Sequence, residues 1–458
     1  MKKTRSNMHY PVFIISMLCM ALILANTGLF HFTVICMNPE NAKIQSVNGS
    51  SPFSPFQESW IFSIVAVGRL AGAPPTVAMI NRFGLRVTFT LFGLLSGIAT
   101  LLMPVFSESF VFQLLVRCVQ GLGVTSVYVA HGAIPLAWGS PTEQGFLVSL
   151  LSWSYELAPM LSMALSGLFC TSPLGWSGVY YLFGSATILC FIAFFVVYST
   201  SPFKKRFTLP KNSTSAQVFP TGDTQPIENK KLEVPYRSIF SCASVWGVWM
   251  TALGDGVGYQ MFVMYGPTYI NKALHYEIAD TGLLAAFPFL ISIGTKFIGG
   301  VLLDKATCIN DHYRILIFTS FAQAAMAICF MVLTFLSSET ATLAQTVFTL
   351  TIVFSGLHCV GCFSASQRVA KQFNHILTSA MAVENAVVAF LLPGVVALLA
   401  PNHSSSEWAH IFYGIVGVLA VSNLTFMMVT KIKPAKWTGP AAIRGQDSKM
   451  TTVSQIHC

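Results

Sequence analysis

The sequence predicts an all-α membrane protein with twelve transmembrane helices arranged as two six-helix bundles. Of its 458 residues, 54% are hydrophobic and only 9% are charged, whereas a soluble domain carries about 25% charged residues. Apolar runs of about 20 residues, the length that crosses the hydrocarbon core of a bilayer, recur along the chain. One long polar stretch, residues 199–241, divides these runs six and six. An aqueous globular fold is excluded, because so few charges would leave its surface unsolvated.

The twelve expected spans follow one another at short intervals. They cover residues 11–37, 57–80, 86–106, 109–138, 145–169, 176–198, 242–271, 279–303, 312–336, 342–367, 376–400 and 408–430. The basic N-terminus leads into the first run in the manner of a secretory signal peptide. We interpret this run as a spanning helix, because it is too long for a typical signal sequence and no small-x-small cleavage site follows it.

The distribution of Lys and Arg predicts the orientation. With both termini in the cytoplasm, 21 of the 26 Lys and Arg residues fall in cytoplasmic segments, and only Lys43 and Lys272 fall in outer loops. Cytoplasmic loops of membrane proteins collect basic residues, so the net charge of +9 needs no nucleic-acid partner. We expect a multi-pass protein of the lipid bilayer with both termini cytoplasmic, in the plasma membrane or in a vesicle or lysosome membrane.

The polar segments predict the domain organisation. An N-terminal six-helix bundle (1–198) is followed by a flexible cytoplasmic linker (199–241), a C-terminal six-helix bundle (242–430) and a disordered cytoplasmic tail (431–458). Two glycosylation sequons fall in the expected outer loops, at Asn48 and Asn402.

No catalytic, cofactor or metal pattern is visible. Cys359 and Cys362 form a C-x-x-C pair, but it lies inside an apolar run without a second pair, so we expect a buried helix face and no metal. The chain has no phosphate-binding loop, which disfavours ATP-driven transport. We therefore expect neither an enzyme nor a cofactor.

Seven ionisable residues fall inside the expected spans. They are Arg69, Arg117, His131, Glu156, Asp255, Lys296 and Glu384. A charge at membrane depth is costly, so each residue is a candidate for function, with an interhelical ion pair as the alternative. Arg117 is the first candidate for substrate binding or gating, because a guanidinium can bind a carboxylate or phosphate through two parallel hydrogen bonds. It can instead pair permanently with Asp255, Glu384 or Glu156.

Two further candidates for substrate binding or gating lie near the membrane centre. Arg69 in the second span and Asp255 in the seventh can line one cavity from opposite bundles, where a carrier places its site. Glycines flank Asp255 and either admit water or only permit close packing. Tyr128 shares a helical stripe with Arg117 and can face the same cavity.

The remaining polar residues are candidates for proton or ion coupling. Desolvation makes a membrane carboxyl a possible proton carrier, so Glu156 and Glu384 either carry a proton or form ion pairs. His131 lies about 21 Å along the helix from Arg117, at 1.5 Å per residue, which is too far to share one small ligand. It is either a proton-sensitive group near the inner gate or a packing histidine. We expect Lys296 to extend toward the inner membrane surface.

Two short cytoplasmic segments, six spans apart, repeat one pattern. Its residues are Asn81, Arg82, Gly84, Arg86, Gly300, Asp304 and Lys305. Both copies resemble the G-x-L-x-D-R-x-G-R signature of major facilitator transporters, although Asn81 replaces the acid of the first copy. The resemblance implies a conformational latch in which the acid pairs with a neighbouring helix end. The alternative is an ordinary turn with positive-inside charge.

Further motifs resemble those of the anion:cation symporter family of sodium-phosphate cotransporters, sialin and vesicular glutamate transporters. They are R-x-x-Q-G-L at 117–122, H-G at 131–132, G-W-x-x-V-Y-Y-x-F-G at 175–184, V-P-Y-R-x-I from 234, P-T-Y-x-x-x-x-L at 267–274, G-x-L-x-A-x-P-F-L at 282–290 and E-W at 407–408. The resemblance implies a major facilitator fold. It also implies a secondary carrier that moves a small, anionic solute by alternating access and is coupled to H+ or Na+.

Departures from the family pattern leave the substrate and the coupling ion open. The first span has no arginine, Val124 stands where members often have Glu, and Gly254 stands where vesicular glutamate transporters have Arg. These differences also motivate a second hypothesis, a non-transporting membrane receptor or assembly partner on the same fold.

Overall fold

The computed structural model describes residues 9–37, 53–138, 147, 150–198, 235–305 and 310–438, and these form helices and turns. The helices are α2 (His9–Thr33), α3 (Pro55–Leu102), α4 (Phe110–Trp138), α6 (Ser154–Cys170), α7 (Gly175–Val197), α8 (Tyr236–Phe240), α9 (Ala243–Thr268), α10 (Ile278–Lys305), α11 (Asp311–Leu333), α12 (Ala341–Ala370), α13 (Asn374–Leu399) and α14 (Ser405–Val429). A π-helical turn, η3 (Tyr269–Ala273), extends α9, and short 3₁₀ turns occupy Ser338–Thr340, Lys371–Phe373 and Lys436–Thr438.

As far as the structure describes them, all twelve expected spans coincide with helix. The second and third spans are the two arms of α3, which bends at Gly84. Gly84 has a φ of 81°, a left-handed conformation that glycine adopts without steric cost. By length and composition, ten of the described helical segments are apolar enough to cross a membrane. The other two expected spans are α6, which has 17 described residues, and α9, whose apolar run is interrupted by Asp255 and Gln260.

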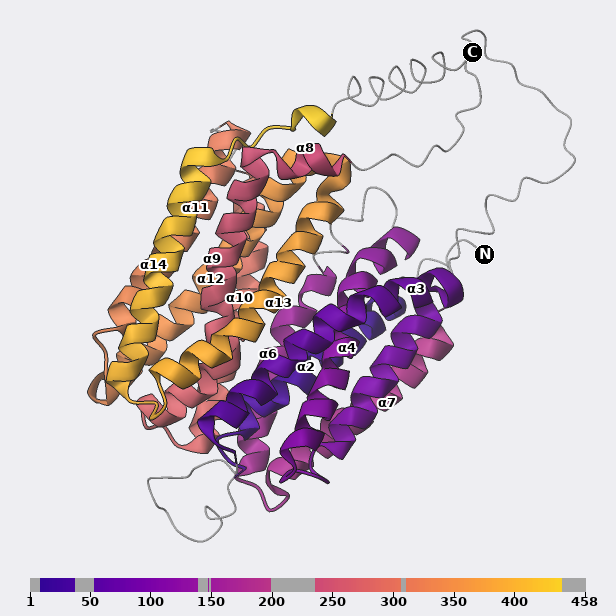
Figure 1. Ribbon diagram of the computed structural model, residues 1–458, viewed down its shortest axis with the longest axis vertical. Helices are drawn as coiled ribbons and strands as arrows, with labels where there is room; N and C mark the ends of the chain where they lie inside the picture. The colour runs from indigo at the N-terminus through magenta and orange to yellow at the C-terminus, as the bar shows by residue number, and fades with distance from the viewer. Residues whose placement is uncertain are drawn as a thin grey trace, which may run out of the picture.

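The helices form two groups that lie side by side (Figure 1). We call helices α2 to α7 the N half and helices α8 to α14 the C half. Within the N half α3 packs on α4 and α7, and within the C half α11 packs on α12 and α14. The main contacts between the halves are those of α6 with α10 and of α3 with α13. We call the end where α7 stops and α8 starts the linker end, and the opposite end the loop end.

Among the described residues, the buried apolar core joins the halves at the loop end only. One cluster contains residues of both halves, among them Phe30, Phe62, Tyr265 and Phe412. Toward the linker end the described core divides into separate clusters. One belongs wholly to the N half and includes Phe89 and the residues that pack on it, and two belong wholly to the C half. The halves are therefore closed on each other at the loop end and have independent cores at the linker end.

Covalent and polar contacts fasten the loop end. A disulfide joins Cys36, just after α2, to Cys170 at the end of α6, with 6.1 Å between their Cα atoms. Asn402 is exposed in the turn before α14, and its side-chain amide donates to Glu407. Asn48 lies outside the described residues.

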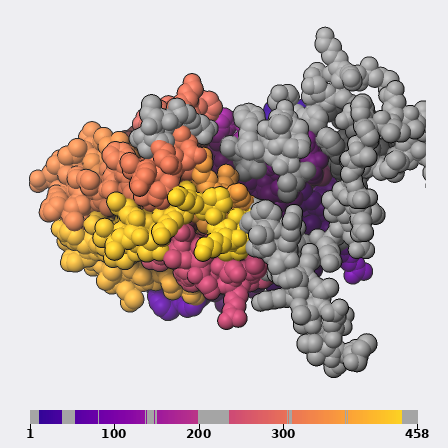
Figure 2. Space-filling view, turned by 90° about the horizontal axis from the view of Figure 1, so that it is seen from above, coloured from indigo at the N-terminus to yellow at the C-terminus, as the bar shows by residue number. Residues whose placement is uncertain are grey.

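The linker end of the C half is covered by the start of the expected tail. Residues 431–438 do not extend away from the protein. The amide of Ala435 donates to the carbonyl oxygen of Val369, and Trp437 packs in a buried cluster with Ile239 and Phe373. Figure 2, viewed from the linker end, shows this segment in yellow beside the pink start of α8 and α9. The expectation of disorder is therefore wrong for this stretch, because Trp437 finds an apolar surface to bury.

Candidate functional site

Arg117 is fully buried inside the N half. Its Nη1 donates to the carbonyl oxygen of Thr27 (2.6 Å) and to Oε1 of Gln120 (3.2 Å), and its Nε donates to the carbonyl oxygen of Ile61 (3.3 Å). The guanidinium also lies over the ring of Phe30, 5.1 Å from the centroid. Arg117 therefore ties α4 to α2 and α3.

The close approach of α3 and α4 explains how Arg117 reaches these carbonyls. A Cβ atom on Gly121 would overlap the carbonyl oxygen of Val65, and one on Gly68 would overlap that of Cys118. Only glycine fits at both positions, so the Q-G of the R-x-x-Q-G-L motif serves the packing that surrounds Arg117. Gln120 completes this arrangement by donating to Thr100.

The expected acidic partner of Arg117 is absent from its hydrogen-bonding shell. A permanent pair with Asp255, Glu384 or Glu156 was the alternative to a binding or gating role, and in the described residues none of these acids pairs with Arg117. The physical reason is that two backbone carbonyls and one amide already orient the guanidinium within the N half. One nitrogen, Nη2, is buried without a hydrogen-bond partner in the described part of the chain.

Arg69 is the second cation of the N half, and it differs from Arg117. Its side chain is half-buried, and its Nε atom is buried without a hydrogen-bond partner. Among the described residues its guanidinium forms no ion pair. Its backbone is fixed, because the hydroxyl of Thr125 donates to its carbonyl oxygen (2.7 Å). Both Arg69 and Arg117 lie within electrostatic range of the buried His31, so the centre of the N half is electropositive.

Tyr128 and His131 meet on the face of α4 that packs toward α6. The ring of Tyr128 lies 5.8 Å from that of Tyr155, and Nδ1 of His131 lies 3.2 Å from the Tyr155 hydroxyl. Tyr155 is also within electrostatic range of Arg69. The structure thus brings Tyr128 and His131 together through Tyr155, a residue that sequence reasoning missed.

Glu156 and Lys296 form an ion pair between the halves. Glu156 lies in α6 and is almost completely buried, and Lys296 lies in α10. The hydroxyl of Tyr259 on α9 also donates to Oε2 of Glu156 (3.3 Å). The expectation that Lys296 extends to the membrane surface is wrong. The carboxylate of Glu156 lies within reach of its ammonium group and compensates the charge there. Of the two readings left open for Glu156, the structure shows the ion pair.

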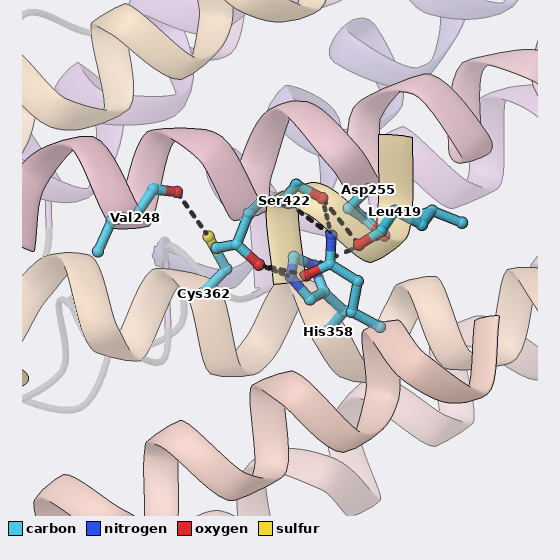
Figure 3. Close-up of polar contacts among 8 residues, drawn as sticks. Val248, Asp255, His358, Cys362, Leu419 and Ser422 are labelled. Carbon is cyan, nitrogen blue, oxygen red and sulfur yellow. Dashed lines mark hydrogen bonds and ion pairs between the residues drawn. The ribbon is translucent and has the colours of Figure 1, made fainter. Parts of the chain in front are cut away.

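Asp255 lies in a buried polar chain of the C half (Figure 3). Its Oδ1 is 3.6 Å from Nδ1 of His358 on α12. The chain continues through Thr251, Gln323 and Ser422, so it links α9, α12, α11 and α14. Sequence reasoning missed His358, although an ionisable residue beside the C-x-x-C pair inside an apolar run was an available signal.

Glu384 on α13 is half-buried, and its Oε2 atom is buried without a hydrogen-bond partner in the described residues. Its neighbour Asn385 accepts from Gln260 of α9 (2.7 Å). Asp255 and Glu384 therefore place two carboxylates in the C half without a Lys or Arg partner in the described chain. Among the described intramembrane candidates, those without an ion-pair partner of opposite charge are thus Arg69 and Arg117 in the N half, and those without a Lys or Arg partner are Asp255 and Glu384 in the C half.

In the described part of the expected latch, no side chain bonds to another latch residue. Arg86 donates to the carbonyl oxygen of Phe195 (2.7 Å from Nε) and stacks on its ring, within the N half, and Arg82 lies over the adjacent Phe83. A Cβ atom on Gly300 would meet nothing within 4 Å, and Lys305 is exposed. The side chains of Asn81 and Asp304 lie outside the described part of the structure.

A different acid gathers basic residues at the linker end. Asp311, the first residue of α11, pairs with Arg314 (2.8 Å) and with Arg368 near the end of α12. This cluster lies in the C half alone, beside an open cavity of about 400 Å³. Asp311 thus pairs with basic residues of α11 and α12 within one half.

The fold and this arrangement define a multi-pass membrane protein of the secondary-carrier class. The chain belongs to the Major Facilitator Superfamily, whose family model matches residues 10–390. This family consists of membrane transporters and not of enzymes.

Several curated relatives are similar to this chain in sequence. The chain is 24% identical over 284 residues to mouse (Mus musculus) sodium-dependent phosphate transport protein 3, a match that covers 61% of this chain but only 58% of the relative. It is 22% identical over 391 residues to the probable small intestine urate exporter of the mouse, covering 84% and 78% of the two chains. It is 25% identical to human (Homo sapiens) sodium-dependent phosphate transport protein 4, covering 68% and 74%.

Two solved structures share the fold. One is a bacterial homolog of the human lysosomal transporter Spinster in an inward-facing, unoccupied conformation, with a TM-score of 0.69 and 12% identity, covering 92% of this chain and 97% of that one. The other is a D-xylose-proton symporter, with a TM-score of 0.66 and 15% identity, covering 93% and 98%.

Proposed function

We propose that the protein is a secondary active transporter that moves a small organic or inorganic anion across a membrane by alternating access. The observation that carries this proposal is Arg69, a half-buried guanidinium without a carboxylate partner in the described residues. A cation held at membrane depth needs a counter-charge, and a mobile anion supplies one. Phosphate and urate, which the names of the relatives mention, are both anions.

Arg69 and Arg117 have different roles in this proposal. Arg69 contacts the anion, because its guanidinium is free to form two parallel hydrogen bonds with it. Arg117 positions α2 and α3 and adds positive potential through its unpartnered Nη2. Tyr128 and Tyr155 border the site on the side of α4 and α6.

The conformation supports an inward-open state. The linker end is the cytoplasmic end in our proposal, because the expected linker and both termini carry most of the basic residues. The Cys36–Cys170 disulfide lies at the opposite end, as expected for a loop that faces an oxidising, non-cytoplasmic compartment. Because the halves share one core at the loop end, the anion would enter or leave from the cytoplasm in this state.

The coupling ion is H+ or Na+ in this proposal. Carboxylates that lack a Lys or Arg partner in the C half, Asp255 and Glu384, are the candidate positions for it. The alternative of a non-transporting receptor is not supported, since the relatives compared above are named for transport or export.

Counterflow of labelled phosphate and of labelled urate into proteoliposomes tests the proposal. We expect saturable exchange of at least one of these anions, and a loss of about tenfold or more in Arg69→Gln, because a charged hydrogen bond is worth about 1.5–3 kcal/mol. Lys431→Gln, at an exposed position just after α14, is the control and should exchange at the wild-type rate. Folded protein that exchanges no anion, or an Arg69→Gln variant with normal exchange, would overturn the proposal.

A further inference from the structure

A chain of five buried or nearly buried polar residues crosses the C half (Figure 3). It runs from Asp255 through His358, Thr251 and Gln323 to Ser422. Of these, only Asp255 retains appreciable exposure, at 17% of its side chain, whereas His358 is 1% exposed. A buried polar network must satisfy its donors and acceptors internally, so its protons can be counted.

The orientation of the Gln323 amide is fixed at two points. Its nitrogen lies 3.4 Å from the carbonyl oxygen of Thr251, which can only accept a hydrogen bond. The same nitrogen lies 2.9 Å from the hydroxyl of Ser422, and that hydroxyl uses its own proton on the carbonyl oxygen of Leu419 (3.1 Å). The Nε2 atom of Gln323 is therefore the donor to both, and its Oε1 faces Thr251 as an acceptor.

This orientation fixes the tautomer of His358. Thr251 must donate its single hydroxyl proton to Oε1 of Gln323, 2.5 Å away. Its oxygen then accepts from Nε2 of His358 at 2.9 Å. Because Nε2 carries the proton of the neutral ring, Nδ1 presents a lone pair, and it faces a carboxylate oxygen of Asp255 at 3.6 Å.

Two acceptors thus face each other without a proton between them. Both Nδ1 of His358 and Oδ1 of Asp255 are buried and lack a hydrogen-bond partner in the described residues. We propose that Asp255 and His358 bind one exchangeable proton between Oδ1 and Nδ1, and that this pair is the proton-coupling site of the transporter. The proton comes from water that reaches Asp255, and its uptake converts a repulsive pair of acceptors into a hydrogen bond.

The surroundings of the pair contain both signs of charge. On α10 and α6 the Lys296–Glu156 ion pair lies within electrostatic range, and on α9 Tyr259 does so as well. On α12 the thiols of Cys359 and Cys362 are near, and Glu384 of α13 acts on Cys362. Lys296 is occupied by Glu156, so no free cation of the described chain competes with the proton for Asp255.

The ligand set favours a proton over a metal cation. A hard cation such as Na+ binds carboxylate, carbonyl and water oxygens in preference to an imidazole nitrogen. Here one of the two unpartnered atoms is an imidazole nitrogen, and Thr251 is committed to Gln323. Glu384, which lacks this histidine neighbour, is the comparison position.

Proton binding can be measured without any knowledge of the transported solute. Proteoliposomes of the full chain, adsorbed on a solid-supported membrane, are subjected to a pH jump across the range in which histidine titrates. We expect a transient charge displacement in the wild type and its loss in Asp255→Asn and in His358→Gln. The glutamine keeps a donor for Thr251 but presents no titrating nitrogen to Asp255. Asp280→Asn, an exposed acid at the loop end of α10, is the matched control and should keep the signal.

Two outcomes would overturn the proposal. The first is a signal that survives in folded Asp255→Asn, and loss of that signal in Glu384→Gln would then assign it to Glu384. The second is a displacement produced by a Na+ jump and not by a pH jump. The coupling role rests on the proposed anion transport. Asp255→Asn should therefore lose the accumulation of phosphate or urate that a pH gradient drives in the wild type. If the wild type shows no counterflow, the transport proposal fails, and the pH jump still decides whether the proton site exists.

Discussion

Glu156 of α6 and Lys296 of α10 form an ion pair that joins the two halves. Toward the loop end, further contacts follow. Ser63 donates to the carbonyl oxygen of Phe390 (2.8 Å), and Phe62 stacks on Tyr265 at 5.0 Å. Toward the linker end, the described halves have separate cores. The ion pair therefore marks the inner limit of the closed region, and opening the loop end must break it.

Glu156→Gln should shift the protein toward the state that is open at the loop end. Removing one partner of a buried ion pair costs about 3 kcal/mol or more, because the other charge stays buried. That cost falls on the closed state and corresponds to roughly a hundredfold change in the equilibrium. The rate of crosslinking between cysteines introduced at Trp60 and Phe390 should therefore fall in Glu156→Gln. In the closed state the rings of these two residues lie 6.4 Å apart.

The matched control is the exchange of charges, Glu156→Lys combined with Lys296→Glu. The double variant should recover most of the crosslinking rate, because the pair is restored with its direction reversed. Equal rates in the wild type and in Glu156→Gln would show that the pair does not hold the loop end closed.

Gly167 of α6 and Gly282 of α10 form a close backbone approach between the halves. A Cβ atom on either residue would lie 2.7 Å from the Cα atom of the other. Gly167→Leu should therefore destabilise the closed state by about 1–3 kcal/mol, the usual cost of overpacking, and slow transport by about tenfold. The same crosslinking assay measures the loss of the closed state. Gly414→Leu on α14, where a Cβ atom meets nothing within 4 Å, is the control, and an equal effect there would refute the steric explanation.

The two buried arginines of the N half should respond differently to substitution. Arg117→Gln should lower the free energy of unfolding by about 2 kcal/mol and reduce Tm, because hydrogen bonds from a charged donor to Thr27 and Ile61 are lost. Arg69→Gln should leave Tm unchanged, since its guanidinium has no partner in the described residues. Thermal unfolding in detergent checks both, and a larger loss in Arg69→Gln than in Arg117→Gln would contradict these assignments.

Much of the fold could be predicted from local sequence, and the reason is the bilayer. Length and apolarity alone decide whether a segment spans, so even α9 was identified despite Asp255 and Gln260. The kink at Gly84 and the charge that Arg117 places inside the N half follow from equally local rules. The packing of Trp437 could not be predicted from local sequence. The apolar surface that it contacts is assembled from Ile239 and Phe373, which are distant in sequence.

The partners of the intramembrane charges could not be predicted in the same way. Helix periodicity places residues on a face of their own helix, but Lys296 and Glu156 come from different halves, 140 residues apart. The rotation of each helix about its axis decides such pairings, and it depends on glycine contacts such as that of Gly68 with Gly121. For the same reason, local sequence does not show that backbone carbonyls of α2 and α3, and not an acidic side chain, bind Arg117.

His403, in the turn before α14 at the loop end, should make stability depend on pH. Burial and the nearby Lys272 lower the pKa of His403, although Glu407 opposes them. Its ring stacks on Trp408 at 5.7 Å. As the pH falls through about 6.5, the unfolded chain takes up this proton first, so the folded state loses stability progressively toward the lower pKa of the folded protein. Above that range the contribution of neutral His403 is fully present.

Tm measured across this pH range should therefore fall less steeply in His403→Gln than in the wild type, because glutamine does not titrate. The exposed His410, whose Nδ1 lies 2.8 Å from the carbonyl oxygen of Ser406, supplies the control substitution His410→Gln. A His403→Gln profile parallel to that of the wild type would show that His403 protonates equally in the folded and unfolded chains. A steeper profile would mean that its protonated form is stabilised at the loop end, in which case the attraction of Glu407 outweighs burial and Lys272.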